Sequence, residues 1–200
     1  QTPQRVAYDF LQANRELFKL QNPAQELTIN NISNPDNLGI THIRLYQQYN
    51  GVRVFAADMV AHLNQQGQLV TINGVYHPTP PQGTNTTPAI TTEQARLRIA
   101  QSLGLDQPPI IPQTLKEQLH IHDDHDLEVL VLLHQPENNT FKLAWQITFF
   151  ENFLQHKDYF VDAQTGEILF KLNNICNLGP ETATAKDLNG KNQTINVYNS

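Results

Sequence analysis

Histidine and aspartate residues are concentrated between residues 120 and 126, where the sequence reads His-Ile-His-Asp-Asp-His-Asp. Imidazole and carboxylate groups at this density are ligand types that bind divalent cations. On a strand, His120 and His122 would lie on the same face. The run is also polar and precedes an apolar stretch, which is typical of a solvated loop. We favour the loop, and keep His120, His122 and His125 as weak candidates for metal ligands.

Catalytic constellations are missing from the sequence. It contains no H-E-x-x-H zinc motif, no G-x-S-x-G nucleophile elbow, no phosphate-binding loop and no set of cysteines at zinc-site spacing. Carboxylates such as Asp58, Asp123 and Glu151 are present, but no pattern pairs them in a pocket. Cys176 is the single cysteine, so it cannot form an internal disulfide. We therefore predict no catalytic residue and no enzymatic activity for the chain itself.

Composition excludes two classes of partner. The 200 residues carry a net charge of −6, and the 13 lysines and arginines are spread along the chain without forming a basic run. A nucleic-acid-binding face needs such a cluster. No stretch approaches 18 apolar residues, so the sequence predicts no membrane span. The chain begins at Gln1 without an initiator methionine, from which we expect an upstream signal peptide or another removed segment.

Two helices are predicted. The first starts at Thr2 with Pro3 just inside, and its apolar residues follow helical spacing as far as Phe18 before Asn22-Pro23 ends it. The second starts at Thr91, because Thr91 and Gln94 have the spacing of a capping box, and it stops at Gly104.

Strand-like runs follow each helix. Those after the first helix are residues 41–49, 52–63 and 69–76, and Asn50-Gly51 between the first two is a strong hairpin signal. A segment rich in Pro, Thr and Gly interrupts the pattern from residue 77 to residue 88. The runs after the second helix are residues 127–133, 141–149, 159–162 and 168–172.

The order of helix and then sheet therefore occurs twice. A helix packed on one face of an antiparallel sheet buries the apolar side of both elements. We predict an α+β fold of two consecutive cystatin-like units, each a helix packed on an antiparallel β-sheet. Trp145 and the phenylalanines near it alternate with polar residues, which indicates core positions. Residues 173–200 contain few large apolar groups, and we expect them to contribute little to either core.

Several of these residues form recognisable motifs. The runs His42–Phe55, Val60–Leu63 and Ile72–Gly74 together resemble the fungalysin/thermolysin propeptide domain. The runs Leu143–Ile147 and Asp158–Leu169 resemble the PepSY domain that follows it in precursors of thermolysin-like proteases. The motif positions, expected to be structural, are His42, Arg44, Gln47, Tyr49, Gly51, Val54, Trp145, Asp162 and Gly166.

The C-terminal part extends the resemblance. Thr182–Lys191 resembles the opening of a mature thermolysin-like enzyme, although Ala183 and Ala185 stand where glycine is common. In the first unit, Arg53 stands where the family usually has proline. The resemblance implies four regions: a fungalysin/thermolysin propeptide domain (1–80), a linker (81–88), a PepSY domain (89–175), and the maturation junction with the start of mature-like sequence (176–200).

The resemblance also implies a function. Such a prosegment assists the folding of the catalytic domain and blocks its zinc cleft until the connection is cut. The expected inhibitory or scissile segment is Asn174, Ile175, Cys176, Asn177 and Leu178, because thermolysin-like enzymes favour a bulky apolar residue just after the cut. The implied partner is the catalytic domain of its own protease, in a secreted or periplasmic precursor. We expect no cofactor in this chain, and zinc and calcium only in the catalytic domain.

One alternative remains open. PepSY-type domains also occur without an attached protease, so the chain could be a free-standing inhibitor or adaptor. A dedicated inhibitor has no reason to carry the mature-like residues 182–200. A reading frame that continues to an H-E-x-x-H motif favours the prosegment, and one that stops at Ser200 favours the alternative.

Overall fold

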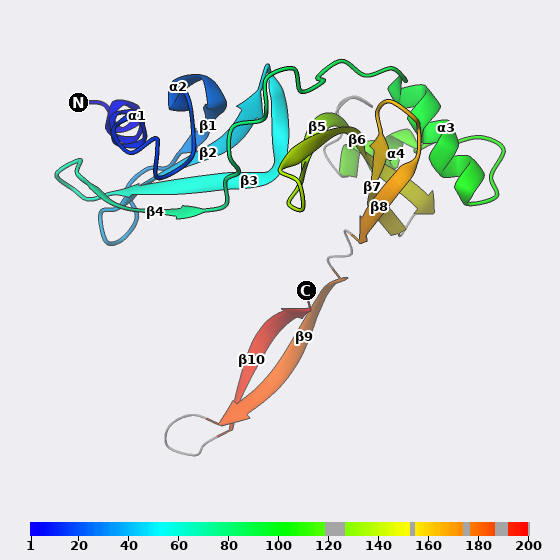
Figure 1. Ribbon diagram of the computed structural model, residues 1–200. Coiled ribbons are helices and arrows are strands. Elements are labelled where there is room, and N and C mark those ends of the chain that lie inside the picture. Colours follow the sequence, from blue (N-terminus) through cyan, green and yellow to red (C-terminus); the bar gives the residue numbers. More distant parts are fainter. Residues whose placement is uncertain (119–126, 153–154, 174–176, 187–191, 200) are drawn as a thin grey trace.

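The computed structural model describes residues 1–118, 127–152, 155–173, 177–186 and 192–199. They form an α+β fold, which confirms the predicted class (Figure 1). The helices are α1 (Pro3–Ala13), α2 (Pro23–Glu26), α3 (Thr92–Ser102) and α4 (Gln113–Gln118). The strands are β1 (Leu27–Ile32), β2 (Thr41–Tyr49), β3 (Val52–Leu63), β4 (Leu69–Gly74), β5 (Glu128–Gln135), β6 (Thr140–Asn152), β7 (Gln155–Asp162), β8 (Ile168–Asn173), β9 (Asn177–Lys186) and β10 (Asn192–Asn199).

Eight of these strands form one mixed sheet. Its order is β1-β2-β3-β5-β6-β7-β8, and β4 pairs with β3. All neighbours are antiparallel except β3 and β5, which run parallel. The predicted hairpin between β2 and β3 is present, with φ of +49° at Asn50 and +82° at Gly51. This left-handed pair is the geometry that favours Asn-Gly in a two-residue turn.

The long strand β3 joins the two halves of the molecule. The first half contains α1, α2 and β1 to β4, and the second contains α3, α4 and β5 to β8. Its later residues, Met59 to Leu63, pair with β4, whereas Arg53 and Val54 pair with Val131 and Leu132 of β5. The sequence predicted a separate antiparallel sheet for each half, and the structure instead has one sheet that continues through both. Sequence periodicity does not reveal this junction because the parallel register covers two residue pairs that are far apart in the chain.

Helix α1 packs on the first half of the sheet. Thr2 caps it by accepting a hydrogen bond from the Arg5 amide at 3.4 Å, as expected from its position before Pro3. The prediction that the helix runs to Phe18 is wrong, because it ends at Ala13. Nδ2 of Asn14 donates to the Phe10 carbonyl at 2.8 Å and so satisfies a backbone acceptor at the end of the helix.

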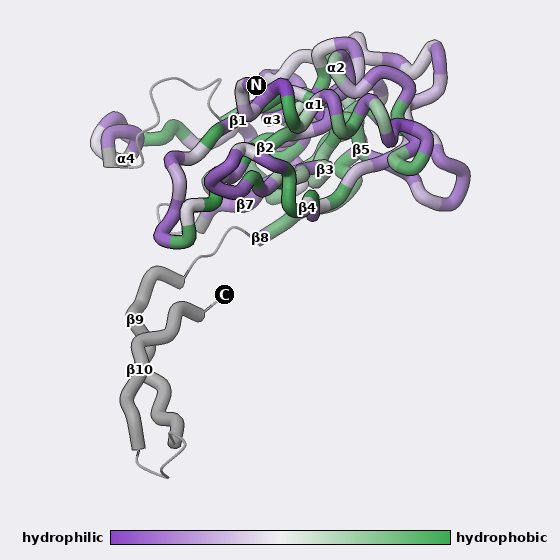
Figure 2. The backbone as a smooth tube through the Cα atoms, turned by 90° about the vertical axis from the view of Figure 1, so that its left-hand side faces the viewer, coloured by the Kyte–Doolittle hydropathy of each residue, from purple (hydrophilic) through white to green (hydrophobic). Residues whose placement is uncertain are grey.

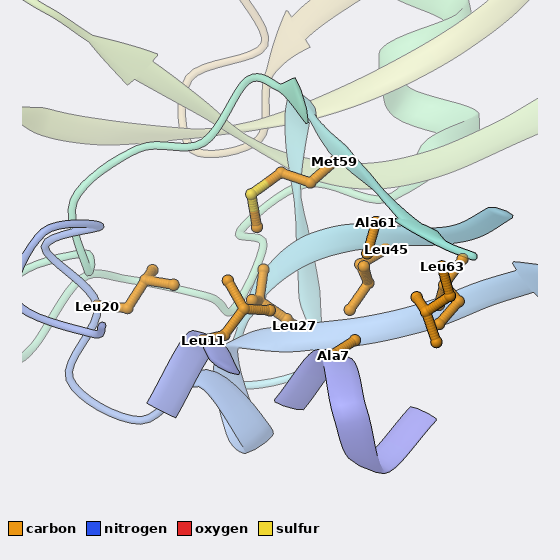
Figure 3. Close-up of a cluster of buried hydrophobic side chains, with 9 residues drawn as sticks. Ala7, Leu11, Leu20, Leu27, Leu45, Met59, Ala61 and Leu63 are labelled. Atoms are coloured by element: carbon orange, nitrogen blue, oxygen red, sulfur yellow. The ribbon is translucent and has the colours of Figure 1, made fainter. Parts of the chain in front are cut away.

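The first hydrophobic core lies between α1 and strands β1 to β3 (Figure 3). Its members come from α1, the following turn and the facing side of the sheet: Ala7, Leu11, Leu20, Leu27, Ile43, Leu45, Met59, Ala61 and Leu63. Along β2 and β3 these side chains alternate with more exposed ones, as expected for a sheet with one covered face. In Figure 2, hydrophobic residues are grouped along strands such as β5, and hydrophilic residues predominate in the loops.

Helix α3 packs on the second half. Its capping box is confirmed, since the Thr91 side chain accepts from the Gln94 amide and the Gln94 side chain accepts from the Thr91 amide. Gly104, with φ of +75°, ends it as predicted. The Leu105 amide donates to the Ala100 carbonyl at 2.9 Å, which is the bond of a Schellman motif. Ala95, Ile99 and Ala100 are fully buried against β6 and β7.

Five elements were not predicted from the sequence. Helices α2 and α4 and strand β1 are short, so each offers few residues for a periodic pattern. Strands β9 and β10 form an antiparallel pair, with Thr182 opposite Asn196 and Ala185 opposite Gln193. The sequence predicted no strand there, because residues 173–200 contain few large apolar groups.

Candidate functional site

Motif residues from β2 and from the β6–β8 region contact the segment that connects the two halves, residues 75–91, which we call the connecting segment. Gln47 is completely buried, and its amide forms two hydrogen bonds with the backbone of His77. Nε2 donates to the His77 carbonyl at 2.7 Å, and Oε1 accepts from the His77 amide at 2.8 Å. The Tyr49 hydroxyl donates to the Pro81 carbonyl at 3.3 Å. Both residues therefore attach β2 to the start of the connecting segment.

The far end of that segment is attached to the second half. Nε1 of Trp145 donates to the Ile90 carbonyl at 2.9 Å. The Ala163 carbonyl accepts from the amides of Ala89 at 2.8 Å and Ile90 at 3.1 Å. Nε2 of Gln164 donates to the Thr87 carbonyl at 2.8 Å. The region predicted as a linker is thus bonded to both halves of the molecule.

The Ala163 carbonyl and the Gln164 side chain belong to the turn between β7 and β8. Oδ1 of the buried Asp162 accepts from the amides of Gln164 at 2.8 Å and Thr165 at 3.0 Å, which closes the turn. Gly166 has φ of +78°, where a side chain would be strained, and an added Cβ would lie 3.4 Å from Nε of Arg98 in α3. Asp162 and Gly166 therefore stabilise the backbone conformation of this turn.

The other motif residues lie in β2, β3 and their turn. Val54 is fully buried where β3 meets β5, Gly51 is in the hairpin turn, and Arg44 is exposed on β2. His42 contacts His62 of β3, with 2.8 Å between their Nδ1 atoms. The sequence analysis included His62 only within the motif run Val60–Leu63 and gave it no role of its own, although its position opposite His42 follows from the correctly predicted hairpin.

A hollow lined by aromatic groups lies where the two halves and the connecting segment meet. Its volume is about 320 Å³, and we call it the aromatic hollow. Its lining consists of Phe55, His77, Leu133, His134, Gln135, Pro136 and Phe170. The rings of His77 and His134 are stacked with centroids 4.2 Å apart, and the ring of Phe170 stacks on Phe160 at 4.3 Å.

The lining of the aromatic hollow is mostly apolar and aromatic. Burial lowers the pKa of His77, and the charge of His134 lowers it further, so His77 is neutral at pH 7. No carboxylate, hydroxyl or thiol is in the lining. The hollow can therefore accept an apolar side chain but holds no nucleophile with a paired base.

Strand β8 leads from the aromatic hollow to the predicted inhibitory segment. It is the last strand in the order of the sheet and pairs with β7 along one edge. Phe170 and Leu172 on this strand are 39% and 42% exposed. Asn174, Ile175 and Cys176 lie outside the described residues, and Asn177 and Leu178 are the first residues of β9.

The predicted metal ligands His120, His122 and His125, as well as Asp123, lie outside the described residues. Within the residues that are described, no group of three or more His, Cys, Asp or Glu side chains is arranged to hold a metal ion. No helix in that part of the chain is long and apolar enough to cross a membrane.

Two carboxylates from the sequence analysis have basic partners. Asp58 forms a bidentate pair with Nη2 of Arg53, at 2.9 and 3.0 Å. Glu151 accepts from Nζ of Lys157 at 2.8 and 2.7 Å and from the Tyr159 hydroxyl at 2.5 Å. The bonds from Lys157 and Tyr159 lower the pKa of Glu151. Neither carboxylate is arranged as a general acid or base.

Comparison with known proteins points to one class. Residues 26–76 match the model of the Fungalysin/Thermolysin Propeptide Motif. The chain is 26% identical over 174 residues to Thermolysin of Alicyclobacillus acidocaldarius, covering 86% of this chain and 30% of that protein. It is 24% identical over 190 residues to Bacillolysin of Bacillus amyloliquefaciens, covering 94% of this chain and 34% of that protein. The chain thus spans about a third of the length of these relatives.

A solved structure, the Bacillus megaterium YpeB C-terminal domain, is similar at 16% identity with a TM-score of 0.38, over 86% of this chain and 63% of that one. The match of the motif model shows that the chain carries the fungalysin/thermolysin propeptide motif, and the sequence similarity is to the propeptide region of thermolysin-like precursors. The matched motif contains β2, β3 and Gln47, the residue that fixes the connecting segment.

Proposed function

We propose that this chain is the prosegment of a secreted or periplasmic thermolysin-like metalloprotease, in which it assists folding of the catalytic domain and blocks its zinc cleft until cleavage. The observation that carries the proposal is the propeptide motif within a chain that aligns over most of its length with about a third of two such proteases. Zinc and calcium would belong to the catalytic domain. The two halves of the present chain would correspond to a cystatin-like propeptide unit and a cystatin-like PepSY unit.

The geometry supports a rigid binding platform. One sheet passes through both halves, and the connecting segment is bonded to each of them through Gln47 and Trp145. A platform that is ordered before it binds loses little conformational entropy on association. Such a partner stabilises the native protease and its folding transition state relative to the unfolded chain, which accelerates folding.

The contact surface in this proposal is the aromatic hollow together with the edge of β8 that pairs with no other strand among the described residues. An edge strand can pair with a strand of another domain, and exposed apolar side chains add affinity. Phe170 belongs to both features, because it lies on β8 and lines the aromatic hollow. Residues 174–178 would continue from β8 into the zinc cleft. Covalent attachment gives a high effective concentration, so cleavage weakens the inhibition.

The test is to add the whole 200-residue chain in trans to its cognate catalytic domain. We expect slowed peptide hydrolysis and a higher yield of active enzyme on refolding from denaturant. Phe170→Ser should weaken both effects, whereas Val70→Ser, at a residue 61% exposed on β4, should not. A folded chain that neither inhibits the enzyme nor assists its refolding rejects the proposal. Rescue or inhibition of unrelated proteases only would favour the free-standing inhibitor.

The position of the maturation bond is tested separately. Candidate bonds are Asn174-Ile175 and Asn177-Leu178, each with an apolar residue after the cut. Sequencing the N-terminus of the mature enzyme should place its first residue between 174 and 186. A start elsewhere would reject this inhibitory segment while leaving the prosegment proposal intact.

A further inference from the structure

Two imidazole nitrogens converge between β2 and β3. His42 and His62 are directly opposite each other in the register of these strands, and their Nδ1 atoms are 2.8 Å apart. The ring planes are nearly perpendicular, at 88°, so the nitrogens meet without stacking of the rings. Their neighbours Ile43 and Ala61 are completely buried in the core under α1. The two histidines therefore lie on the opposite face of the sheet, where ions from solvent have access.

The outer nitrogens of both rings face hydrogen-bond acceptors. Nε2 of His42 is 3.1 Å from Oδ2 of Asp36, and Nε2 of His62 is 2.7 Å from Oδ1 of Asn73. These acceptors favour the tautomer of each ring that has its hydrogen on Nε2. A neutral imidazole with its hydrogen on Nε2 has a lone pair on Nδ1. The two Nδ1 lone pairs then lie close together, and a cation bound to both nitrogens makes the arrangement favourable.

Asp36 is held in place before any ion binds. Its Oδ1 accepts from the amides of Leu38 at 2.8 Å and Ile40 at 2.9 Å, which leaves Oδ2 for His42. A carboxylate on the outer nitrogen is the usual support of a metal-binding histidine, because it orients the ring and increases its basicity.

We propose that His42 and His62 form a two-histidine site for a divalent late transition metal, Cu²⁺ or Ni²⁺, bound through both Nδ1 atoms and completed by water. With a metal–nitrogen bond of about 2.0–2.1 Å, nitrogens this far apart subtend an angle of roughly 85° at the metal. Tetragonal Cu²⁺ and Ni²⁺ accept such adjacent ligands, whereas tetrahedral Zn²⁺ requires the nitrogens to separate.

This site is independent of the proposed prosegment function, and either can fail without the other. It also differs from the histidines at 120, 122 and 125. With two protein ligands the ion would be exchangeable, in contrast to the zinc expected in the catalytic domain. A metal bound to both histidines links β2 to β3 and stabilises the folded chain, because the unfolded chain does not hold them together.

The test must remove the competing run of histidines first. A background chain with His120→Gln, His122→Gln and His125→Gln is titrated with Cu²⁺ and with Ni²⁺ by calorimetry at pH 7.5. We expect one ion per chain and an increase in Tm when it is present. Electron paramagnetic resonance of the Cu²⁺ form should show two coupled nitrogens.

Substitutions identify the ligands. His42→Gln and His62→Gln in that background should each abolish the bound ion, and His156→Gln, at a histidine stacked on Phe150, should leave it unchanged. Asp36→Asn keeps both ligands and should weaken binding about 10- to 100-fold. Circular dichroism confirms that each variant is folded. Binding that survives both ligand substitutions, or a folded background chain that binds neither ion, overturns the proposal.

Discussion

The side chain of Gln47 and the backbone of His77 form a closed pair of hydrogen bonds, 2.7 and 2.8 Å long, across 30 residues of sequence. Gln47 is completely buried, so neither group of its amide can find water in place of this partner. The bond pair fixes the point where the chain leaves the first half of the sheet. It also sets the position of His77 beside His134 in the aromatic hollow.

Gln47→Ala removes both bonds and leaves two backbone groups of His77 without their partner. Each unsatisfied buried polar group costs about 1–3 kcal/mol. We expect a decrease of at least about 2 kcal/mol in the free energy of unfolding, measured by urea denaturation. Gln66→Ala is the matched control, because Gln66 is exposed in the turn between β3 and β4. Equal effects of the two substitutions would show that the bond pair does not stabilise the fold.

His77 predicts a pH dependence of stability. The pKa of His77 is lowered in the folded chain, first by burial and then by the charge of His134, whereas in the unfolded chain it is about 6.5. Between the two pKa values the unfolded chain binds more protons, so the free energy of unfolding falls as pH drops below about 6.5. The contribution is fully present above that pH.

His77→Gln tests this dependence, because it keeps the backbone bonds to Gln47 and removes the titrating ring. The stability of the wild-type chain should fall more steeply than that of His77→Gln between pH 7 and 5. His134→Gln removes the second cause of the lowered pKa of His77. The stability of this variant should therefore depend on pH less steeply than that of the wild-type chain. Parallel stability curves for wild type and His77→Gln would contradict the prediction. Urea unfolding at several pH values provides the measurement.

Much of the fold could be predicted from local signals. The Thr91 capping box, the Asn50-Gly51 turn and Gly104 each specify backbone geometry within a few residues, and the structure contains all three. The end of α1 was predicted wrongly because Phe18 continues the helical spacing, yet its ring packs on Tyr76 from a turn, at 5.2 Å. The β3–β5 junction depends on residues 53–54 and 131–132, which no local pattern connects.

The candidate site was less predictable. Residues such as Gln47 and Trp145 were identified through resemblance, and only the three-dimensional contacts explain their roles, because both bond to backbone atoms far away in sequence. The aromatic hollow combines Phe55, His77 and Phe170 from three regions of the chain. Its members have no common spacing that sequence reasoning could detect.

A second stability prediction concerns Tyr159 and Glu151. Tyr159 is 2% exposed, and its hydroxyl donates to the Glu151 carboxylate at 2.5 Å. Burial and this bond raise the pKa of Tyr159. Tyr159→Phe keeps the ring and removes a bond to a charged group, which costs about 1.5–3 kcal/mol.

The control for Tyr159→Phe is Tyr46→Phe. The Tyr46 ring lies 5.0 Å from the guanidinium of Arg53, and within the described residues its hydroxyl has no hydrogen bond. This substitution should change the free energy of unfolding by less than about 0.5 kcal/mol. Thermal and urea unfolding measure both variants. A Tyr159→Phe chain as stable as Tyr46→Phe would show that Lys157 alone satisfies Glu151.

Leu132 tests whether the two halves unfold together. It is completely buried, pairs with Val54 across the β3–β5 junction, and packs in a cluster that contains residues from both halves. Leu132→Ala should cost about 2–5 kcal/mol through lost burial and the cavity that remains. Trp145 is the single tryptophan and lies in the second half, so its fluorescence reports on that half, while far-UV circular dichroism reports on the whole chain.

In the wild-type chain both probes should give one unfolding midpoint, because one sheet and one buried cluster span the halves. In Leu132→Ala the midpoints from fluorescence and circular dichroism should separate. The parallel pairing of β3 and β5 covers only two residue pairs, so few other contacts at this junction compensate for the lost side chain. Val129→Ala, at a residue 44% exposed on the same strand, should leave the midpoints coincident. Coincident midpoints in Leu132→Ala, at lower stability, would mean that the fixed connecting segment couples the halves without this junction.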